Sequence, residues 1–343
     1  MKVYLDNAAT TPIASEVIEE IQPYLNNYFG NPSSTHAFGR KTKNAIEINR
    51  KKIADLIQAK NNEIIFTSGG TEADNMALRC AVFDLNVKRI ITTKIEHHAV
   101  LHTAECLRDQ QNVEVIFLAT DHNGNPDLVQ LESILNDKVN TLVTLMHANN
   151  EIGTLLPIKK VASICAKHKH VYFHSDTVQT MGHYTFNLSE TPIDFLTCSA
   201  HKLHGPKGVG FLYVNQKISL NPLITGGSQE RKNRGGTENL YGIVGLGKAM
   251  EMAYENLTSH QKHIQGLKLF MKKELEKIDQ RISFNGETSP EKSLYTVLNV
   301  CFPADVCNSM LLFSLDIHGI AASGGSACSS GSVSYTHLTL PTI

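Results

Sequence analysis

The chain has 343 residues, of which 41% are hydrophobic and 19% are charged, and its formal net charge is −1. This composition is typical of a soluble globular protein with room for one large and one smaller domain, and the balanced charge gives no indication of nucleic acid or an anionic membrane as a partner. No apolar stretch reaches the roughly 20 residues of a membrane span, and the first residues lack the apolar core of a signal peptide, so we expect a cytoplasmic protein.

Strand-like runs alternate with amphipathic helical stretches from about residue 60 to residue 215, which predicts a mostly parallel sheet wrapped by helices. The helical stretches include Asp127–Leu135 and Ile158–Lys167. The expected strands are Glu63–Thr67, Arg89–Thr93, Glu114–Leu118, Thr141–His147, Val171–His174, Asp194–Cys198 and Gly210–Val214. Beyond them, the pattern from Tyr241 to about Ile278 predicts a long helix that bridges to a second domain. A strand at Tyr295–Val300 and a helix near Asp305–Asp316 then predict a small α+β domain.

The first motif along the chain is a glycine turn between a strand and a helix, within Phe66–Asn75. Backbone N–H groups at a helix N-terminus, together with Gly70 and the Thr71 hydroxyl, can form a seat for a phosphate. Taken alone, the segment also fits an ordinary helix cap after a tight turn.

Two further strand ends carry polar side chains. His97 and His98 follow one of them, but no H-E-x-x-H motif or matching carboxylate spacing accompanies the pair, so we expect no metal site. An imidazole stacked on a flat cofactor ring fits this position as well. Asn150 follows another strand and offers amide donors, and a plain asparagine turn is the alternative.

The strongest signal is Lys202 in the segment Ser199–Gly208, which follows a buried strand-like run. Asp176 and Gln179 lie just upstream, where another such run ends. Open α/β sheets bind their ligands at strand ends of this kind. An amine for a Schiff base, a carboxylate for a pyridinium nitrogen, and hydroxyl and imidazole donors for a phosphate are what pyridoxal phosphate requires. Lys202 alone fits a surface lysine and Asp176 alone a helix cap, but the combination predicts a pyridoxal-phosphate enzyme.

The last third of the chain contributes two loops. Arg234–Asn239 is glycine-rich and carries a guanidinium group and the Thr237 hydroxyl, although a plain loop has the same composition. Cys328 lies in the small, glycine-rich segment 321–332, which predicts either a mobile loop that presents a thiol or a linker that happens to contain a cysteine. The other six cysteines show no paired spacing, so no disulfide framework is expected; they are Cys80, Cys106, Cys165, Cys198, Cys301 and Cys307.

Together these motifs resemble the NifS/IscS-like cysteine desulfurases, which are class V, fold-type I (aspartate aminotransferase-like) pyridoxal-phosphate enzymes. The resemblance runs from Tyr4–Thr11 through Gly30–His36 to Ser323–Ser329, and Leu-Asp-Asn-Ala-Ala-Thr-Thr, Ser-Ala-His-Lys and Arg-Gly-Gly-Thr-Glu-Asn are its most specific segments. It implies an α/β fold with a mostly parallel seven-stranded sheet in a large domain.

The domain boundaries follow from the same resemblance. Residues 15–255 are expected to form the large cofactor-binding domain, and residues 1–14 and 256–332 a smaller α+β domain that is truncated at its C-terminus. Residues 333–343 do not continue the pattern, and we suspect a non-native tail. A family arginine that binds the substrate carboxylate is expected in the missing stretch, so the chain is expected to bind its cofactor but to be poorly active.

The resemblance also implies the roles of the site residues. Lys202 carries the cofactor as a Schiff base, Asp176 pairs with the pyridinium nitrogen, and Gln179 bonds the ring hydroxyl. His97 stacks on the ring and is the acid–base partner, and Asn150 approaches the ring and the substrate. Cys328 accepts the sulfur. The remaining residues hold the phosphate, with the last one coming from the neighbouring subunit of a homodimer; they are Gly70, Thr71, Ser199, His201 and Thr237.

The implied reaction is removal of sulfur from L-cysteine, giving L-alanine and a persulfide on Cys328. A protein acceptor such as an iron–sulfur scaffold would take this sulfur, for cluster assembly, tRNA thiolation or both. Three alternatives stay open: a selenocysteine lyase, another class V aminotransferase-fold pyridoxal-phosphate enzyme, and an inactive sulfur-assembly scaffold.

Overall fold

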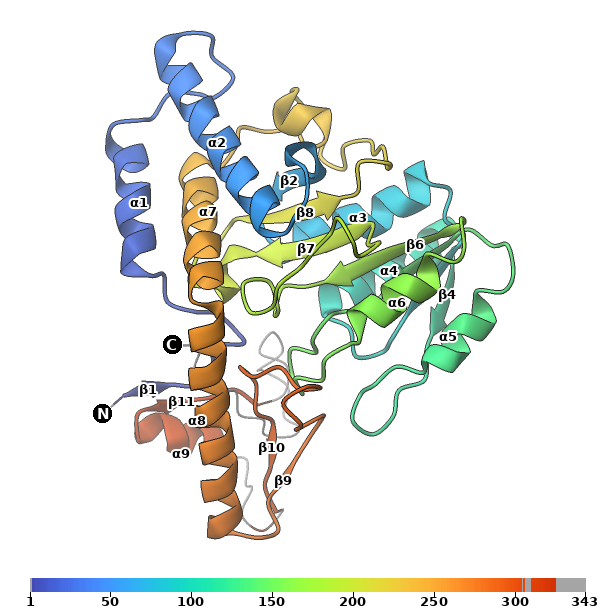
Figure 1. Cartoon of the computed structure of the whole chain (residues 1–343), viewed down its shortest axis with the longest axis vertical. Helices are drawn as coiled ribbons and strands as arrows, with labels where there is room; N and C mark the ends of the chain where they lie inside the picture. The colour runs from blue at the N-terminus through green and yellow to red at the C-terminus, as the bar shows by residue number, and fades with distance from the viewer. Residues whose placement is uncertain (1, 304, 306–309, 325–343) are drawn as a thin grey trace.

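The computed structural model describes residues 2–303, 305 and 310–324. Figure 1 shows a helix-covered sheet above and a smaller group of short strands with one helix below, alongside the long helix α8. The helices are α1 (Ser15–Asn26), α2 (Ala37–Leu56), α3 (Gly70–Asp84), α4 (His98–Gln111), α5 (Leu128–Ile134), α6 (Ile158–Cys165), α7 (Leu240–Glu255), α8 (Leu257–Ile278) and α9 (Leu311–Ile317). The strands are β1 (Val3–Tyr4), β2 (Ile64–Thr67), β3 (Arg89–Thr92), β4 (Glu114–Phe117), β5 (Thr141–Thr144), β6 (Val171–Asp176), β7 (Phe195–Ser199), β8 (Gly210–Val214), β9 (Ser283–Phe284), β10 (Val300–Cys301) and β11 (Ile320–Ala321).

The main sheet has seven strands in the order β2-β8-β7-β6-β5-β3-β4. Strands β4, β3, β5, β6 and β7 run parallel, and β8 is antiparallel to both β7 and β2. Each of the seven strands predicted from the sequence occurs in this sheet. The prediction of a mostly parallel, seven-stranded sheet is therefore confirmed.

Alternating residues of the strands pack into two separate hydrophobic cores. Ile64 and Phe66 of β2 and Val143 of β5 belong to the core that is shared with α2, α6 and α7. Ile65 and Leu142 belong to the core that is shared with α3 and α4. Successive side chains of a strand point to opposite faces, so an apolar residue at every position is the pattern of a sheet covered on both sides. In Figure 1, α6 lies in front of this sheet and α4 behind it.

The polar groups of interest lie where the parallel strands end. Asp176 is the last residue of β6, and Ser199 is the last residue of β7. Because these strands are parallel, with Asp176 opposite Thr197, both endings lie at the same edge of the sheet. The turn between β2 and α3 approaches this edge as well, since a Cβ atom on Gly70 would meet the Thr197 and Ser199 side chains at 3.6 and 3.7 Å.

The helix predicted from Tyr241 to Ile278 is two helices that meet at Asn256. This residue has φ −103° and ψ 6°, and its side-chain Nδ2 donates to the carbonyl of Met252 at 3.0 Å. An asparagine side chain that binds the preceding turn offers the backbone an alternative to helix continuation. The uninterrupted helix expected from the sequence is therefore wrong, because a 3.6-residue periodicity does not register this break.

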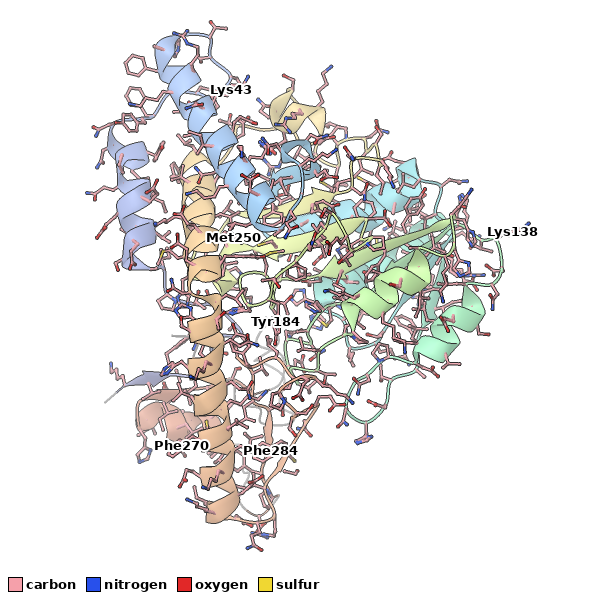
Figure 2. The ribbon with its side chains drawn as sticks, viewed as in Figure 1. Lys43, Lys138, Tyr184, Met250, Phe270 and Phe284 are labelled. Atoms are coloured by element: carbon pink, nitrogen blue, oxygen red, sulfur yellow. The ribbon has the colours of Figure 1, made fainter. Side chains whose placement is uncertain are left out.

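The strand predicted at Tyr295–Val300 is also mostly wrong. Only Val300 pairs, in β10, opposite Phe284 of β9. Tyr295 is buried without strand pairing, and its ring lies 5.8 Å from that of Tyr184, which is labelled between the sheet and the lower part in Figure 2. The segment is apolar because it packs against the sheet-bearing part of the chain.

The helix predicted near Asp305–Asp316 is represented by α9, which begins at Leu311. Residues 304 and 306–309 lie outside the described residues. Among the residues that are described, no helix combines the length and the apolar character needed to cross a membrane.

Candidate active site

A cavity of about 190 Å³ lies at the carboxyl edge of the sheet. It is lined by nine of the ten residues that the sequence predicted to bind a cofactor, namely Gly70, Thr71, His97, Asn150, Asp176, Gln179, Ser199, His201 and Lys202. The tenth, Thr237, lines a different cavity of about 180 Å³ on the same chain. The structure therefore brings together groups that are 132 positions apart in the sequence, from Gly70 to Lys202.

Lys202 ends a short 3-10 turn that follows β7 directly. Its amine donates hydrogen bonds to the carbonyl oxygens of Ala8 and, at 2.9 Å, of Ala9. The half-buried amine thus points into the cavity beneath the N-terminal segment. This is the placement of a cavity amine and not of a solvated surface lysine.

Asp176 is buried at the end of β6, and its Oδ1 accepts a hydrogen bond from the backbone N–H of Val178 at 2.8 Å. Burial, together with the smaller effect of the nearby carboxyl group of Asp74, raises the pKa of Asp176 to about 7. Within the described part of the chain, no lysine or arginine forms an ion pair with Asp176. A buried carboxylate of this kind is stabilised by a cation, and a protonated ring nitrogen is such a cation.

Asp74 is a cavity residue that sequence reasoning missed. It is buried, and its Oδ1 lies 3.4 Å from Nε2 of the fully buried His174. One possible ligand atom from each of Asp74, Asp176 and His97 falls within 4.8 Å of the others. The available signal was spacing: Asp74 follows Gly70 by four positions in a helix, so both residues face the same side.

His97 caps the N-terminus of α4, because its Nδ1 accepts the backbone N–H of Ala99 at 3.1 Å. Nδ1 is therefore the acceptor nitrogen, which leaves the ring proton of a neutral imidazole on Nε2. Burial lowers the pKa of His97, and the opposing effect of Asp176 is smaller. A neutral, aromatic imidazole at the cavity wall can stack on a ring or move a proton.

The sequence left open whether this segment supplies an amide to the site or only forms an asparagine turn. In the structure, Asn149 and Asn150 each take one of these two roles. Asn149 Oδ1 accepts the backbone N–H groups of Glu151 and Ile152, both at 2.9 Å, so it forms the asparagine turn. Asn150 lines the cavity. On the opposite wall, Gln179 Nε2 donates to the carbonyl of Ala8 at 3.0 Å, so the N-terminal segment also orients this amide.

At the phosphate seat predicted at the start of α3, the backbone passes so close to neighbouring side chains that glycine is needed. Gly69 has φ +150°, which favours glycine, and a Cβ atom on Gly70 would lie 2.8 Å from Cγ2 of Val178. The N-terminus of α3 therefore borders the cavity, which Gly70 and Thr71 line. Burial and then Lys202 lower the pKa of His201 to about 4, so His201 is a neutral donor whose Nδ1 lies 3.1 Å from Thr10 Oγ1.

The N-terminal segment is the second contribution that sequence reasoning did not assign to the site. Ala8 and Ala9 line the cavity and accept the Lys202 hydrogen bonds through their backbone carbonyls. Backbone acceptors leave no side-chain signal, although the Leu-Asp-Asn-Ala-Ala-Thr-Thr segment had been singled out as a motif. Cys328 and the suspected tail, residues 333–343, lie outside the described residues.

Comparison with known proteins now decides the family. The model of the class-V aminotransferases matches residues 3–342 of this chain. The chain belongs to the class-V aminotransferase family. This class-V chain is 46% identical to the cysteine desulfurase IscS of Dictyoglomus turgidum over 339 residues, which are 98% of this chain and 84% of that protein. It is 44% identical to the putative cysteine desulfurase IscS 1 of Bacillus subtilis over 340 residues, which are 98% of this chain and 88% of that protein.

Solved structures of NifS-like proteins and related proteins are also similar to this chain. A NifS-like protein superposes with a TM-score of 0.91 at 36% identity, over 99% of this chain and 93% of that one. The structure described as SspA in complex with cysteine superposes with a TM-score of 0.81 at 32% identity, over 100% of this chain and 99% of that one. The fold class and the family resemblance predicted from the sequence are confirmed.

The residues of the cavity fit the cofactor that class-V aminotransferases and NifS-like proteins use, which is pyridoxal phosphate. Lys202 offers the amine, and Asp176 offers a buried carboxyl group that lacks a cationic partner within the described chain. The glycine turn before α3 brings the N-terminus of that helix to the cavity, where backbone N–H groups would bind a phosphate. The residues of the cavity therefore fit both the ring and the phosphate of the cofactor.

Proposed function

We propose that this class-V chain is a cysteine desulfurase that uses pyridoxal phosphate bound in the cavity of Lys202 and Asp176. The main observation behind this proposal is that Lys202 and Asp176 line the same cavity, in a chain that is 46% identical to a cysteine desulfurase. Bound pyridoxal phosphate supplies a cationic ring that withdraws electrons from an attached amino acid. The remaining chemistry belongs to residues of this chain.

Asp176 holds a negative charge against the ring nitrogen, which keeps that nitrogen protonated. The Lys202 amine carries the cofactor at rest and, once it is released, accepts the proton from the substrate Cα. Gln179 would donate to the ring hydroxyl, His97 would cover one face of the ring, and Asn150 would contact the ring and the substrate. All five residues line the cavity.

The sulfur leaves L-cysteine by transfer to a thiolate of the protein. Cys328 attacks the substrate sulfur, so an S–S bond forms while the C–S bond breaks, and the carbon skeleton takes up a proton to become alanine. A thiolate is needed because a neutral thiol is a weak nucleophile. His97 is the group proposed to take the thiol proton, at Nδ1, once that nitrogen releases the backbone N–H of Ala99.

The active unit is proposed to be a cytoplasmic homodimer in which Thr237 reaches the phosphate of the neighbouring subunit. This arrangement is supported by the position of Thr237, which lines a cavity other than that of its own Lys202. The sulfur would pass to a protein acceptor, such as an iron–sulfur scaffold or a relay for tRNA thiolation. The match to a structure of SspA with cysteine supports L-cysteine as the substrate.

The experiment is turnover of L-cysteine by the cofactor-loaded protein, followed by mass spectrometry of its peptides. We expect one alanine per sulfur removed, and an adduct of about 32 Da, the mass of one sulfur atom, on the peptide that carries Cys328. Cys328→Ala should form no such adduct and release no alanine. The exposed free cysteine Cys301 gives the matched control, because Cys301→Ala should behave as the wild type. Alanine release at the wild-type rate by Cys328→Ala would favour a lyase or another class-V reaction instead.

A further inference from the structure

Three consecutive residues before the Arg234 loop have a left-handed backbone. The φ angles of Glu230, Arg231 and Lys232 are +44°, +57° and +73°. None of them is glycine, and residues with a Cβ atom adopt this conformation only where the surrounding structure imposes it. The contacts of these residues therefore identify what imposes it.

Glu230 is held by a buried ion pair. Its two carboxylate oxygens accept hydrogen bonds from Nη1 and Nη2 of Arg50 at 2.7 and 2.8 Å. The side chains of Arg50 and Glu230 are 3% and 2% exposed. Glu230 Oε2 also accepts the backbone N–H of Phe66 at 2.9 Å, and Arg50 Nη1 donates to the carbonyl of Ile64 at 2.8 Å. The pair thus fastens the left-handed segment to β2, the strand that leads into the phosphate seat.

Two further pairs extend this arrangement on both sides of the segment. Arg231 Nη2 lies 2.7 Å from Glu47 Oε2 on the surface of α2. Arg234 donates from Nε and Nη2 to the two oxygens of Glu72 at 2.9 and 3.2 Å. We call these three arginine–glutamate pairs (Arg50–Glu230, Arg231–Glu47 and Arg234–Glu72) the clamp.

The clamp reaches the phosphate seat through Glu72. This residue follows Thr71 directly, and its Oε2 accepts the backbone N–H of Ser68 at 2.8 Å. Burial raises the pKa of Glu72, but the hydrogen bonds from Arg234 and Ser68 outweigh it and the pKa is lowered. Glu72 is therefore an ionised side chain that joins both ends of the turn Ser68–Thr71 to Arg234.

We propose that Glu72 and Glu230 are positioning residues that hold the turn Ser68–Thr71 in the shape that binds the cofactor phosphate. The turn contains two consecutive glycines, and a free glycine turn loses much conformational entropy when it is ordered by a ligand. The clamp orders the turn before the ligand arrives. This inference rests on the proposed use of pyridoxal phosphate, and it predicts that the clamp acts on the phosphate and not on the ring.

The test compares two probes on cofactor-free protein: pyridoxal phosphate, and pyridoxal, which lacks the phosphate. Glu72→Gln should weaken the affinity for pyridoxal phosphate by about tenfold or more, because a charge-assisted hydrogen-bond network is lost. The affinity for pyridoxal should stay within about twofold, since its contacts lie at the ring end of the cavity. Glu230→Gln should shift the ratio of the two affinities in the same direction. Asp55→Asn, in the exposed Lys51–Asp55 pair of α2 outside the clamp, is the matched control and should leave the ratio unchanged.

A purely structural role would lower both affinities by the same factor, and that result, or an unchanged ratio in Glu72→Gln, overturns the inference. If Glu72→Gln does not fold, Arg234→Lys tests the same contact, because an ammonium cannot reproduce the two parallel bonds of a guanidinium. Wild-type protein that binds neither probe would overturn the proposed cofactor itself. Wild-type protein that binds pyridoxal phosphate, with an unchanged ratio in the variants, would overturn only the role of the clamp.

Discussion

In the clamp, two nitrogens of Arg50 donate hydrogen bonds to the two carboxylate oxygens of Glu230. In the cofactor cavity, by contrast, Asp74 and Asp176 lie together, and neither forms an ion pair with an arginine or lysine of the described chain. Both regions are buried. Burial lowers the pKa of Arg50, but the Glu230 carboxylate outweighs it and the pKa is raised. In the cavity nothing comparable offsets burial, which raises the pKa of both Asp74 and Asp176 to about 7.

The difference separates two uses of buried charge. Ionised groups that find their partners within the chain fix the architecture, and removing one partner leaves the other charge uncompensated. Ionisable groups gathered in a cavity without partners mark a place that a ligand completes. We expect substitutions in the cavity to affect chemistry more than folding, and substitutions in the clamp to affect folding and phosphate binding more than the chemical step.

The largest effect is expected from Lys202→Ala. Removal of the amine should lower turnover of L-cysteine by roughly a thousandfold or more, because a covalent and proton-transfer residue is lost. The visible absorbance of the lysine-bound cofactor should vanish, while the unfolding temperatures of the variant and the wild type, both without cofactor, stay close to each other. Lys207→Ala, an exposed lysine in the same segment, serves as the control. Retained absorbance in Lys202→Ala would contradict the assignment of the amine.

Asp176→Asn is expected to lower turnover by about a hundredfold or more, since the negative charge that supports a protonated ring nitrogen is removed. Cofactor binding should survive, because Lys202 and the turn before α3 remain. Steady-state kinetics at saturating pyridoxal phosphate measure this effect. Turnover near the wild-type value would mean that Asp176 only caps the turn after β6.

Arg50→Ala tests the buried Arg50–Glu230 pair of the clamp. It should destabilise the fold by about 3–5 kcal/mol, because Glu230 is left buried without its partner. The neighbouring Lys51 forms an exposed pair with Asp55, with side chains 63% and 59% exposed, so Lys51→Ala should cost less than about 1 kcal/mol. Denaturant unfolding of the two variants gives the comparison. Equal losses would remove the distinction between buried and exposed pairs.

The smallest effect expected is a pH dependence of the cofactor-free protein. Asp176 has a pKa raised to about 7, so the folded state binds a proton that the unfolded state has released, and the stabilisation is lost as pH rises through that value. Between pH 6.5 and 8.5 this group should cost about 1 kcal/mol. The wild-type pH dependence also contains Asp74, whose pKa is likewise raised to about 7, and the buried histidines His147, His174 and His183. These histidines act in the opposite direction, because their folded pKa values of about 4 lie below the ordinary value near 6.5. Asp176→Asn should lose less stability over the same range, and an identical loss in both proteins would contradict the prediction.

Much of the sheet and of the cavity could be predicted from the sequence, because both depend on local pattern. Apolar runs of four to seven residues identified the strands, and polar residues directly after them met at one edge since the strands are parallel. Asp176 and Lys202 follow this rule. They come from β6 and from the turn after β7, which are neighbouring parallel strands.

The contributions that were missed depend on tertiary contacts. Ala8 acts through a backbone carbonyl, and Asp74 acts from a helix face whose neighbours are known only once the helix is docked. Tyr295 lies in an apolar run that is buried by packing and not by strand pairing, so the strand expected there was wrong. Glu72 and Glu230 gave no signal at all, because their partners Arg234 and Arg50 lie 162 and 180 positions away.

The central claim is that a cationic cofactor supplies the positive charge that the carboxyl groups of the cavity, Asp74 and Asp176, do not find in a lysine or arginine of the described chain. Its most direct test is the stability of the wild-type protein between pH 6.5 and 8.5, measured by denaturant unfolding without and with saturating pyridoxal phosphate. We expect the loaded protein to be more stable throughout, since the ligand binds only the folded state. We also expect the contribution of Asp176 to the pH dependence, a loss of about 1 kcal/mol, to disappear, because a protonated ring nitrogen beside Asp176 keeps that carboxyl group ionised across the whole range. A loaded protein that loses stability with the same slope as the cofactor-free protein would contradict the claim.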